Sequence, residues 1–343
     1  MKELLSYLEA LMAIDSTTGF FTEKDNYLMA FAKQRGIMAV RLNKGGVRFD
    51  FGGEGNPVCL TAHADEIGLM VRWIEPDGRL RLEKVGGLHE FYAIDWNCNV
   101  YARSGKVYTG TVRRKNPGVH VMSDRERDTL PRYDTDVVLT LDENVRSRAD
   151  VEALGITVGD CVSPEARYCV TPSGYVKSRY LDDQACVATL LRLADEIASG
   201  AVQPKRKVSM LFAEYEEIGH GGSCGIPEDT RDFIALDIGV CGTDHDSDEH
   251  KLSIGVKDAS FPYHTVLTNE LVELCKANAI PYALDMFVPH YGSDGNCALR
   301  AGYDVRHALI GPGVLETHGY ERTHLDALQA TLDLCRAIVQ VEQ

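Results

Sequence analysis

The sequence lacks any apolar run long enough to span a membrane, and its cysteines form no recognisable motif. The first residues, Lys2 to Ile14, have the periodicity of an amphipathic helix rather than of a signal peptide. Ten cysteines are scattered singly, and the closest pair is Cys161 and Cys169. These absences exclude a zinc knuckle, a dense disulfide framework and a membrane partner, and they predict a cytoplasmic protein with reduced thiols.

Basic residues are also scarce. Lys and Arg number 36 against 51 Asp and Glu, which gives a formal net charge of −15. A dominating basic face for nucleic acid is therefore not expected. The short basic clusters Arg113 to Lys115 and Arg125 to Arg132 are predicted to be solvated faces or a subunit contact. With 343 residues and 44% hydrophobic residues, the chain can build a large core in one or two domains.

The pattern of strands and helices divides the chain into three stretches. Residues 68–166 show short alternating strands separated by turn sequences, which predicts an inserted all-β domain. Residues 1–67 and 167–343 instead alternate strands with helices. We therefore predict one discontinuous α/β domain, with a mixed sheet flanked by helices, that the β insert interrupts.

The most informative stretch lies where an apolar strand ends in two adjacent carboxylates. Val208 to Phe212 is apolar enough for a buried strand, Glu216 and Glu217 follow it, and the nearby glycines allow a sharp turn. Open α/β sheets bind their ligands at the carboxyl ends of their strands. The alternative is a solvated acidic exit from the strand, because charged residues are mostly exposed.

Histidine and aspartate mark a second predicted strand end. His63 and Asp65 follow the strand Val58 to Ala62, two residues apart on an extended segment, so their side chains project on the same side. A metal-bound imidazole usually donates its other N–H to a carboxylate or carbonyl, and this pair suits that arrangement. A surface histidine beside an aspartate is the alternative.

Other aspartates stand where a free charge would be costly or would cap a helix. Asp237 interrupts the apolar strand Phe233 to Ile238, where a carboxylate must be paired or metal-bound. Asp182 and Asp183 open an alanine- and leucine-rich helix. Capping and metal binding could be divided between these two residues.

Taken in order, these motifs resemble the tetrahedral dinuclear-metal aminopeptidases, the family of the glutamyl aminopeptidases once labelled endoglucanases. Each motif is weak alone, whereas five in order with a β insert between the first and second are specific. The resemblance covers nearly the whole chain. The motifs are His63 to Gly68, Leu181 to Asp183, Glu216 to Gly219, Leu236 to Gly239, and His324.

The resemblance implies a catalytic domain of zinc-peptidase topology and a PDZ-like insert used for dimerisation. It also implies two divalent metal ions per subunit, zinc first, with cobalt or manganese as alternatives. By position, His63 and Asp237 would bind one ion, Glu217 and His324 the other, and Asp182 would bridge both.

The resemblance assigns two further roles. Glu216 would be the general base, and Asp65 would orient His63. For the last ligand, His318 is the alternative to His324. We favour His324, because His318 lies in a glycine-flanked loop that is better suited to substrate contact.

The implied function is that of a cytoplasmic aminopeptidase that removes N-terminal residues from short peptides. A homo-oligomer is expected, with the twelve-subunit tetrahedron of the relatives as its fullest form. Two alternatives stay open: a metal-dependent amidohydrolase, or deacylase, acting on N-acyl amino acids, and a non-catalytic assembly protein that keeps the fold. Gln184 and Leu325-Asp326 stand where relatives usually carry Arg and Ser-Pro, which bears on fine specificity.

Overall fold

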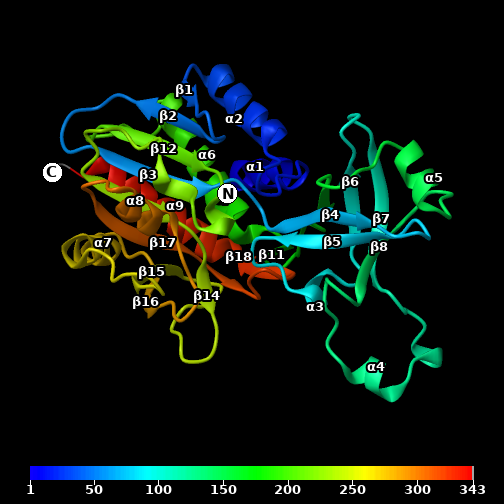
Figure 1. Ribbon diagram of the computed structural model, residues 1–343. Helices are drawn as coiled ribbons and strands as arrows, with labels where there is room; N and C mark the ends of the chain where they lie inside the picture. Colours follow the sequence, from blue (N-terminus) through cyan, green and yellow to red (C-terminus); the bar gives the residue numbers. More distant parts are fainter. Residues whose placement is uncertain (342–343) are drawn as a thin grey trace. The chain divides into compact units, whose positions relative to one another are not determined.

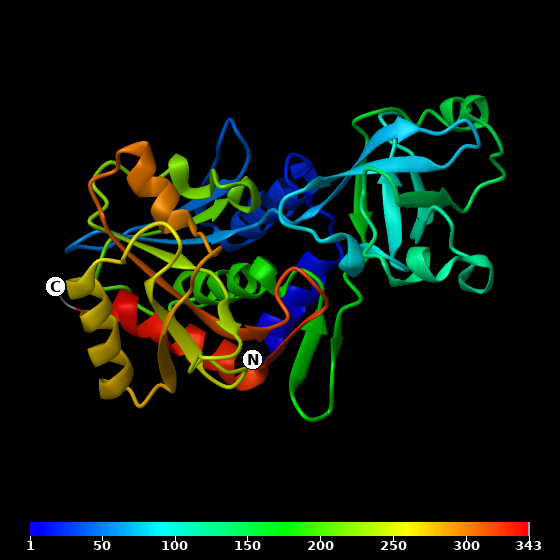
Figure 2. The same ribbon diagram turned by 60° about the horizontal axis from the view of Figure 1, so that its bottom comes forward.

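The computed structural model describes residues 1–341, which form two compact units (Figures 1 and 2). The larger unit combines Met1–Glu66 with the chain from Arg167 onward, and the smaller unit is Ile67–Ala166. The boundaries predicted from the sequence follow residues 67 and 166. Within the described residues, every helix is too short or too polar to cross a lipid bilayer.

The larger unit is built on a mixed sheet that has twelve strands within the described residues. Its main path runs β1-β2-β12-β3-β13-β17-β18-β11-β10; β14 and β15 pair with β17, and β16 pairs with β15. The strands β12, β3, β13 and β17 are parallel to one another, whereas the strands at both edges are antiparallel. The strands are β1 (Met38–Arg41), β2 (Val47–Phe51), β3 (Val58–His63), β10 (Cys169–Val170), β11 (Tyr175–Ser178), β12 (Val208–Ala213), β13 (Asp232–Leu236), β14 (Gly239–Cys241), β15 (Leu252–Lys257), β16 (Tyr282–Met286), β17 (Arg306–Leu315) and β18 (Glu321–His324).

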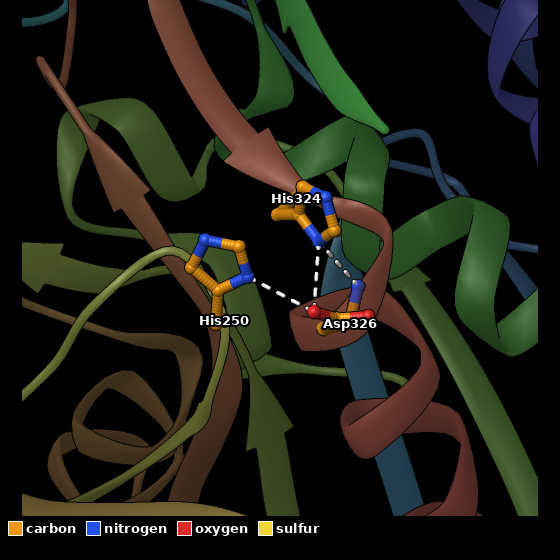
Figure 3. A group of neighbouring side chains, drawn as sticks. All are labelled: His250, His324 and Asp326. Atoms are coloured by element: carbon orange, nitrogen blue, oxygen red, sulfur yellow. Dashed lines mark hydrogen bonds and ion pairs between the residues drawn. The ribbon is translucent and has the colours of Figure 1, made fainter. Parts of the chain in front are cut away.

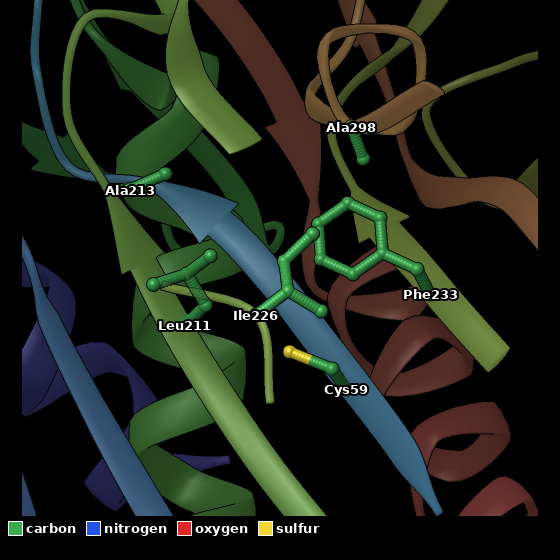
Figure 4. Packing of buried hydrophobic residues seen from close by; sticks show 6 residues of the cluster. All are labelled: Cys59, Leu211, Ala213, Ile226, Phe233 and Ala298. Atoms are coloured by element: carbon green, nitrogen blue, oxygen red, sulfur yellow. The ribbon is translucent and has the colours of Figure 1, made fainter. Parts of the chain in front are cut away.

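Helices cover both faces of the central strands, which explains why these strands are buried along their whole length. On one face, α8 and the segment around Ile226 cover side chains at alternate strand positions, such as Cys59 and Phe233 (Figure 4). On the other face, α6 and α9 pack against β3, β17 and each other, and α1 packs on α6. The helices of this unit are α1 (Lys2–Met12), α2 (Thr22–Arg35), α6 (Leu181–Ala198), α7 (Thr265–Ala277), α8 (Asp294–Ala301) and α9 (Leu325–Gln340).

The smaller unit is a closed barrel in the order β4-β5-β8-β7-β6-β9. Its strands alternate between buried apolar side chains, such as Leu80, Leu82 and Val112, and exposed polar ones, as expected of a small barrel with a filled interior. The insert is therefore rich in β-strands as predicted, but it is not all-β, because it also contains three short α-helices. The elements are β4 (Gly68–Ile74), β5 (Leu80–Val85), α3 (Glu90–Ala93), β6 (Asn97–Tyr101), β7 (Val107–Arg114), α4 (Asp124–Asp128), β8 (Val137–Leu141), α5 (Arg148–Ala153) and β9 (Cys161–Pro164).

A buried ion-pair network holds the amino ends of the central strands. Asp232 opens β13 and lies in register with Arg306, which opens β17. The Asp232 carboxylate accepts hydrogen bonds from Arg306 Nε at 2.7 Å and from the guanidinium of Arg206, which precedes β12. Asp232 and Arg206 are almost fully buried. The network therefore pins the edge of the sheet opposite to its carboxyl ends.

Asp232→Asn is expected to lower the free energy of unfolding by about 3–5 kcal/mol, because it leaves the buried guanidinium of Arg206 without its counter-charge. Asp229→Asn is the matched control, since Asp229 pairs with Lys207 and both side chains are half exposed. That variant should lose less than about 1 kcal/mol. Urea unfolding of both variants at one protein concentration measures the difference, and equal losses would contradict a special role for the network.

Candidate metal centre and active site

The side chains predicted to carry chemistry meet at the carboxyl edge of the parallel strands. His63 is the last residue of β3, and Asp237 directly follows β13 rather than lying inside it. Glu216 and Glu217 lie in a short 3₁₀ turn after β12, and Asp182 is the second residue of α6. The apolar strands thus end at one place, and the polar residues that follow them are brought together there.

The carboxylate of Asp182 lies between two imidazole rings. Its Oδ1 is 3.1 Å from His63 Nε2, and its Oδ2 is 3.5 Å from His318 Nε2. His318 Nε2 is also 3.5 Å from Glu217 Oε2, and His63 Nε2 is 3.8 Å from Glu216 Oε2. The two rings therefore share one carboxylate, and each also has a glutamate beside it.

Asp237 completes this group. Asp237, His63 and Glu216 each have one donor atom within 4.8 Å of the donor atoms of the other two. Asp237, Asp182 and Asp183 form a second triplet within the same distance. His63, Asp182 and Glu217 form a further triplet within this distance. The structure thus brings together His63, Asp182, Glu216, Glu217 and Asp237, as predicted.

His324 does not join this group, and His318 takes the place that was predicted for it. The reason lies in β18, where Glu321 and Thr323 face inward and Arg322 and His324 face the other way. Glu321 points to the site, since its Oε2 accepts the Asp182 N–H at 3.0 Å. His324, three residues further on, must then point away. The favoured choice between the two histidines is corrected accordingly.

Glu321 was missed by the sequence analysis. Its two oxygens accept the backbone N–H groups of Asp182 and His318, at 3.0 and 2.9 Å, so one buried carboxylate fixes both segments. In the sequence, only its position three residues after His318 could have drawn attention to it. That spacing has no structural meaning until the strand β18 is known. Glu321 therefore positions the site from outside it.

Asp65 lies against the His63 ring that it was predicted to orient, and its carboxylate has further partners. His63 Nδ1 lies 3.0 Å from the carbonyl oxygen of Asp65 and 3.6 Å from its carboxylate. That carboxylate accepts the Glu216 N–H at 3.1 Å and the Thr18 hydroxyl at 2.6 Å. Asp65 thus holds the His63 ring through its backbone and the Glu216 backbone through its side chain.

Asp182 and Asp183 have distinct contacts, and neither caps α6. The N-cap residue of this helix is Tyr180, and no side chain caps it. Asp183 Oδ2 accepts the His63 N–H at 3.2 Å, so this second aspartate holds the end of β3. Of the two aspartates, it is Asp182 that faces both imidazoles.

The site buries several carboxyl groups close together, and this opposes their ionisation. Burial raises the pKa of Glu216 to about 8, and the nearby carboxylates of Asp294 and Asp65 add to this rise. Burial also raises the pKa of Glu217 and of Asp237 well above the usual range, and Asp182 adds to both shifts. Carboxylates that share a dry site resist ionising together.

The two imidazoles respond in the opposite sense. Burial alone would lower the pKa of each ring, but their acidic neighbours outweigh it. The hydrogen bond to Asp182 raises the pKa of His63 well above its ordinary value. Glu217 and Asp182 raise the pKa of His318 to about 10. Burial would raise the pKa of Asp182, but its bonds to His318 and His63 hold it far below the usual range.

These residues fit a divalent cation. Glu217 Oε1 and Asp183 Oδ1 are among the buried side-chain oxygens of the described residues that lack a hydrogen-bond partner. The carboxylates and the two imidazoles form a set of donor atoms. The unpaired carboxylate oxygens and the raised carboxyl pKa values indicate that this set lacks a positive charge. Imidazole nitrogen and carboxylate oxygen are ligands that zinc and related ions accept.

A pocket of about 490 Å³ opens above the group. Its floor is acidic, and its walls carry apolar side chains, which is typical of a site that binds a small ligand. Tyr291, from the polar loop before α8, is one of the wall residues. The lining is formed by Asp182, Glu216, Glu217, Gly219, Asp237, Ile238, Val240, His245, Phe287, Val288, Pro289, His290, Tyr291, Gly292, Thr317 and His318.

An α/β sheet with imidazoles and carboxylates at its carboxyl edge, below a pocket of this size, is the construction of a metal-dependent hydrolase. The sequence profile of the M42 glutamyl aminopeptidases matches residues 45–334. The chain therefore belongs to the M42 peptidase family, whose members are metal-dependent, and the protein is a hydrolase that acts on peptide bonds. The resemblance drawn from the five motifs is confirmed.

Individual relatives agree with this assignment. The chain is 40% identical over 342 residues to the Bacillus subtilis (strain 168) protein named "Putative aminopeptidase YhfE", with 99% of this chain and 98% of the relative covered. The structure matches a TET aminopeptidase from a marine sediment archaeon of the Thaumarchaeota, with a TM-score of 0.89 at 18% identity over 98% of this chain and 96% of the other. It also matches the Pyrococcus horikoshii TET1 peptidase, with a TM-score of 0.86 at 21% identity over 99% and 100% of the two chains. These structures establish the shared α/β fold.

If His318 holds a metal ion, His318→Ala is expected to lower kcat/KM for an aminoacyl substrate by more than about 100-fold, because removing a metal ligand costs at least as much as removing its supporting partner. Part of the loss should return at high metal concentration. His324→Asn should change kcat/KM by less than about tenfold, since asparagine can still cap α9. Kinetics of both purified variants across a metal titration provide the measurement. A larger loss in His324→Asn would restore His324 as the ligand.

Proposed function

We propose that the protein is a dinuclear-metal aminopeptidase that removes N-terminal residues from short peptides. The observation that carries this proposal is the Asp182 carboxylate, which presents one oxygen to His63 and the other to His318. A carboxylate in that position is placed to bridge two ions. His63 and Asp237 would hold one ion, and Glu217 and His318 the other. The donors suit zinc first, with cobalt or manganese as alternatives.

When bound, such a pair of ions lowers the pKa of a water molecule and polarises the scissile carbonyl group. The proton transfers need a residue of the chain itself. Glu216 faces the pocket beside His63, and the Asp65 carboxylate holds its backbone N–H. We assign to Glu216 the general-base role, in which its carboxylate takes a proton from the attacking water and gives it to the leaving amine.

The pocket also suits the substrate end that an aminopeptidase must recognise. An N-terminal ammonium group is positively charged, and the pocket floor is acidic. Phe287, Val288 and Tyr291 give the wall an apolar surface against which the first side chain of the substrate can pack. The comparisons give no support to the deacylase or to the non-catalytic alternative.

The proposal predicts release of p-nitroaniline from aminoacyl-p-nitroanilides by the purified protein with added zinc, cobalt or manganese. The N-acetylated forms of the same anilides should be cleaved at least about 100-fold more slowly, because a site built for a charged amine rejects the blocked group. Cleavage of N-acetyl amino acids alone would favour the deacylase. Silence of a full substrate panel with each metal would leave the non-catalytic assembly protein.

Glu216→Gln and Glu217→Gln should separate the two glutamates. The first variant should keep its pocket metal and its KM but lose about two to four orders of magnitude in kcat, the usual contribution of a positioned acid and base. The second should bind metal more weakly, so that its lost activity partly returns at high metal concentration. Metal analysis with kcat for both variants is decisive. A Glu216→Gln protein without metal would show that Glu216 is a ligand, which its grouping with His63 and Asp237 also permits.

We also infer a homo-oligomer in which the barrel unit, the insert expected to be PDZ-like, makes the dimer contact. The Pyrococcus horikoshii TET1 peptidase is described as assembling into a tetrahedron or a large octahedral shell. Within the barrel unit of this chain, Phe91, Val119, Val121 and Leu130 are exposed apolar residues that a partner can cover. Light scattering that finds a monomer at micromolar concentration would refute the assembly without affecting the chemistry.

A further inference from the structure

A second cluster of metal-ligating side chains lies outside the residues that line the pocket. His250 stands in the loop between β14 and β15, His324 ends β18 and caps α9, and Asp326 lies in the first turn of α9. Figure 3 shows the two imidazole rings and the carboxylate directed at one another. His250 and Asp326 are exposed, and His324 is half-buried.

The spacing of the donor atoms matches a small divalent ion. Asp326 Oδ2 lies 2.9 Å from His250 Nδ1 and 3.1 Å from His324 Nδ1, and the three donor atoms lie within 4.8 Å of one another. Ligands held at about 2.0–2.1 Å around a tetrahedral zinc ion lie about 3.3 Å apart. Small side-chain shifts therefore admit an ion, and the exposed side of the cluster leaves its fourth position open to water.

The outer nitrogens of both rings are already held. His324 Nε2 lies 2.9 Å from the carbonyl oxygen of Ser173, which can only accept, so Nε2 carries the ring proton. His250 Nε2 lies 3.4 Å from the hydroxyl of Tyr175. Metal-binding histidines almost always have the far nitrogen engaged in this way, which fixes the tautomer and aims the near nitrogen. In His324, Nδ1 consequently keeps its lone pair.

This lone pair lies close to a carboxylate oxygen of Asp326, which is electrostatically unfavourable. His324 Nδ1 accepts the Asp326 N–H at 3.1 Å and also faces the Asp326 carboxylate oxygen at 3.1 Å. Two acceptors at that distance repel one another unless positive charge lies between them. Because Nδ1 has a single lone pair, a cation held by Nδ1 and the carboxylate would replace the Asp326 N–H at this nitrogen while removing the repulsion, and His250 would supply the third donor.

The backbone around the cluster is also fixed before any ion binds. The His324 N–H donates to the Glu249 carbonyl oxygen at 3.1 Å, and the Glu249 carboxylate pairs with Arg322 at 2.6 Å. Tyr175 lies opposite His324 in the β11–β18 register. The loop, the hairpin and the start of α9 therefore present their side chains from anchored positions, so the ordering cost of binding is small.

We propose that His250, His324 and Asp326 form a structural site for zinc or another borderline divalent ion, separate from the catalytic pocket. The ion ties the loop before β15 to the junction of β18 and α9, and the partners of the ring nitrogens extend this tie to the β10–β11 hairpin. Because β18 follows the loop that carries His318, the site steadies the frame of the active site without contributing to its chemistry.

Zinc alone is the probe. Chelator-treated protein is loaded with zinc, passed through a desalting column and analysed for zinc per chain. His250→Ala and His324→Asn should each retain about one zinc per chain fewer than the wild type, with affinity at this site reduced by more than about 100-fold. His120→Ala, which removes an exposed histidine of the barrel unit, is the matched control and should keep the wild-type zinc content.

A second background separates this site from the pocket. In the double variant His63→Ala/Glu217→Gln, in which the pocket is disabled, one tightly held zinc per chain should remain, and adding His250→Ala should remove it. His324→Asn keeps an N-cap for α9, so its zinc-free form should unfold at the same temperature as zinc-free wild type, which verifies the fold. Equal zinc content in all proteins, or zinc held here only at millimolar concentration, would overturn the proposal.

Discussion

The burial of several acidic side chains within one small volume is the constraint on which the rest of this structure depends. Asp182, Glu217 and Asp237 each lose hydration at the carboxyl edge of the sheet, and their charges repel one another. His63 and His318 offset part of this cost, because each imidazole lies against the Asp182 carboxylate. One Glu217 oxygen is buried without a hydrogen-bond partner, so the cost of burying this carboxylate is not fully offset by the protein. A divalent ion would supply the missing positive charge.

The fold meets this cost by fixing both ends of its central strands. At the amino ends, Asp232 joins two arginines in a buried network. At the carboxyl ends, carboxylates outside the site accept backbone N–H groups of site residues: Asp65 holds Glu216, and Glu321 holds His318 and Asp182. Behind Asp65, the buried pair of Glu66 and Lys24 ties the same segment to α2. These backbone hydrogen bonds keep the acidic side chains of the site close together in spite of their mutual repulsion.

Much of the site could be predicted from the sequence, because a strand that is buried on both faces is an apolar run, and the polar residues that end it are easily seen. His63, Glu216, Glu217 and Asp237 were found in this way. The partners of their backbones could not be predicted. Asp65 and Glu216 are 151 residues apart, and Asp182 and Glu321 are 139 apart, so only the folded sheet reveals that they meet. The closed order of the barrel likewise depends on strand pairing that local patterns do not contain.

The choice between His318 and His324 could have used the alternation of side chains along a strand. The sequence analysis relied instead on the position of His324 in the family motif. β18 is only four residues long, and its side chains alternate between the two faces of the sheet. Once Glu321 faces Asp182, His324 must face away, toward His250 and Asp326. One short strand therefore serves two clusters, one on each face. A slip of one residue in its pairing with β11 would exchange those faces, withdraw Glu321 from Asp182 and turn His324 inward, so the β11–β18 register determines which side of the sheet His324 faces.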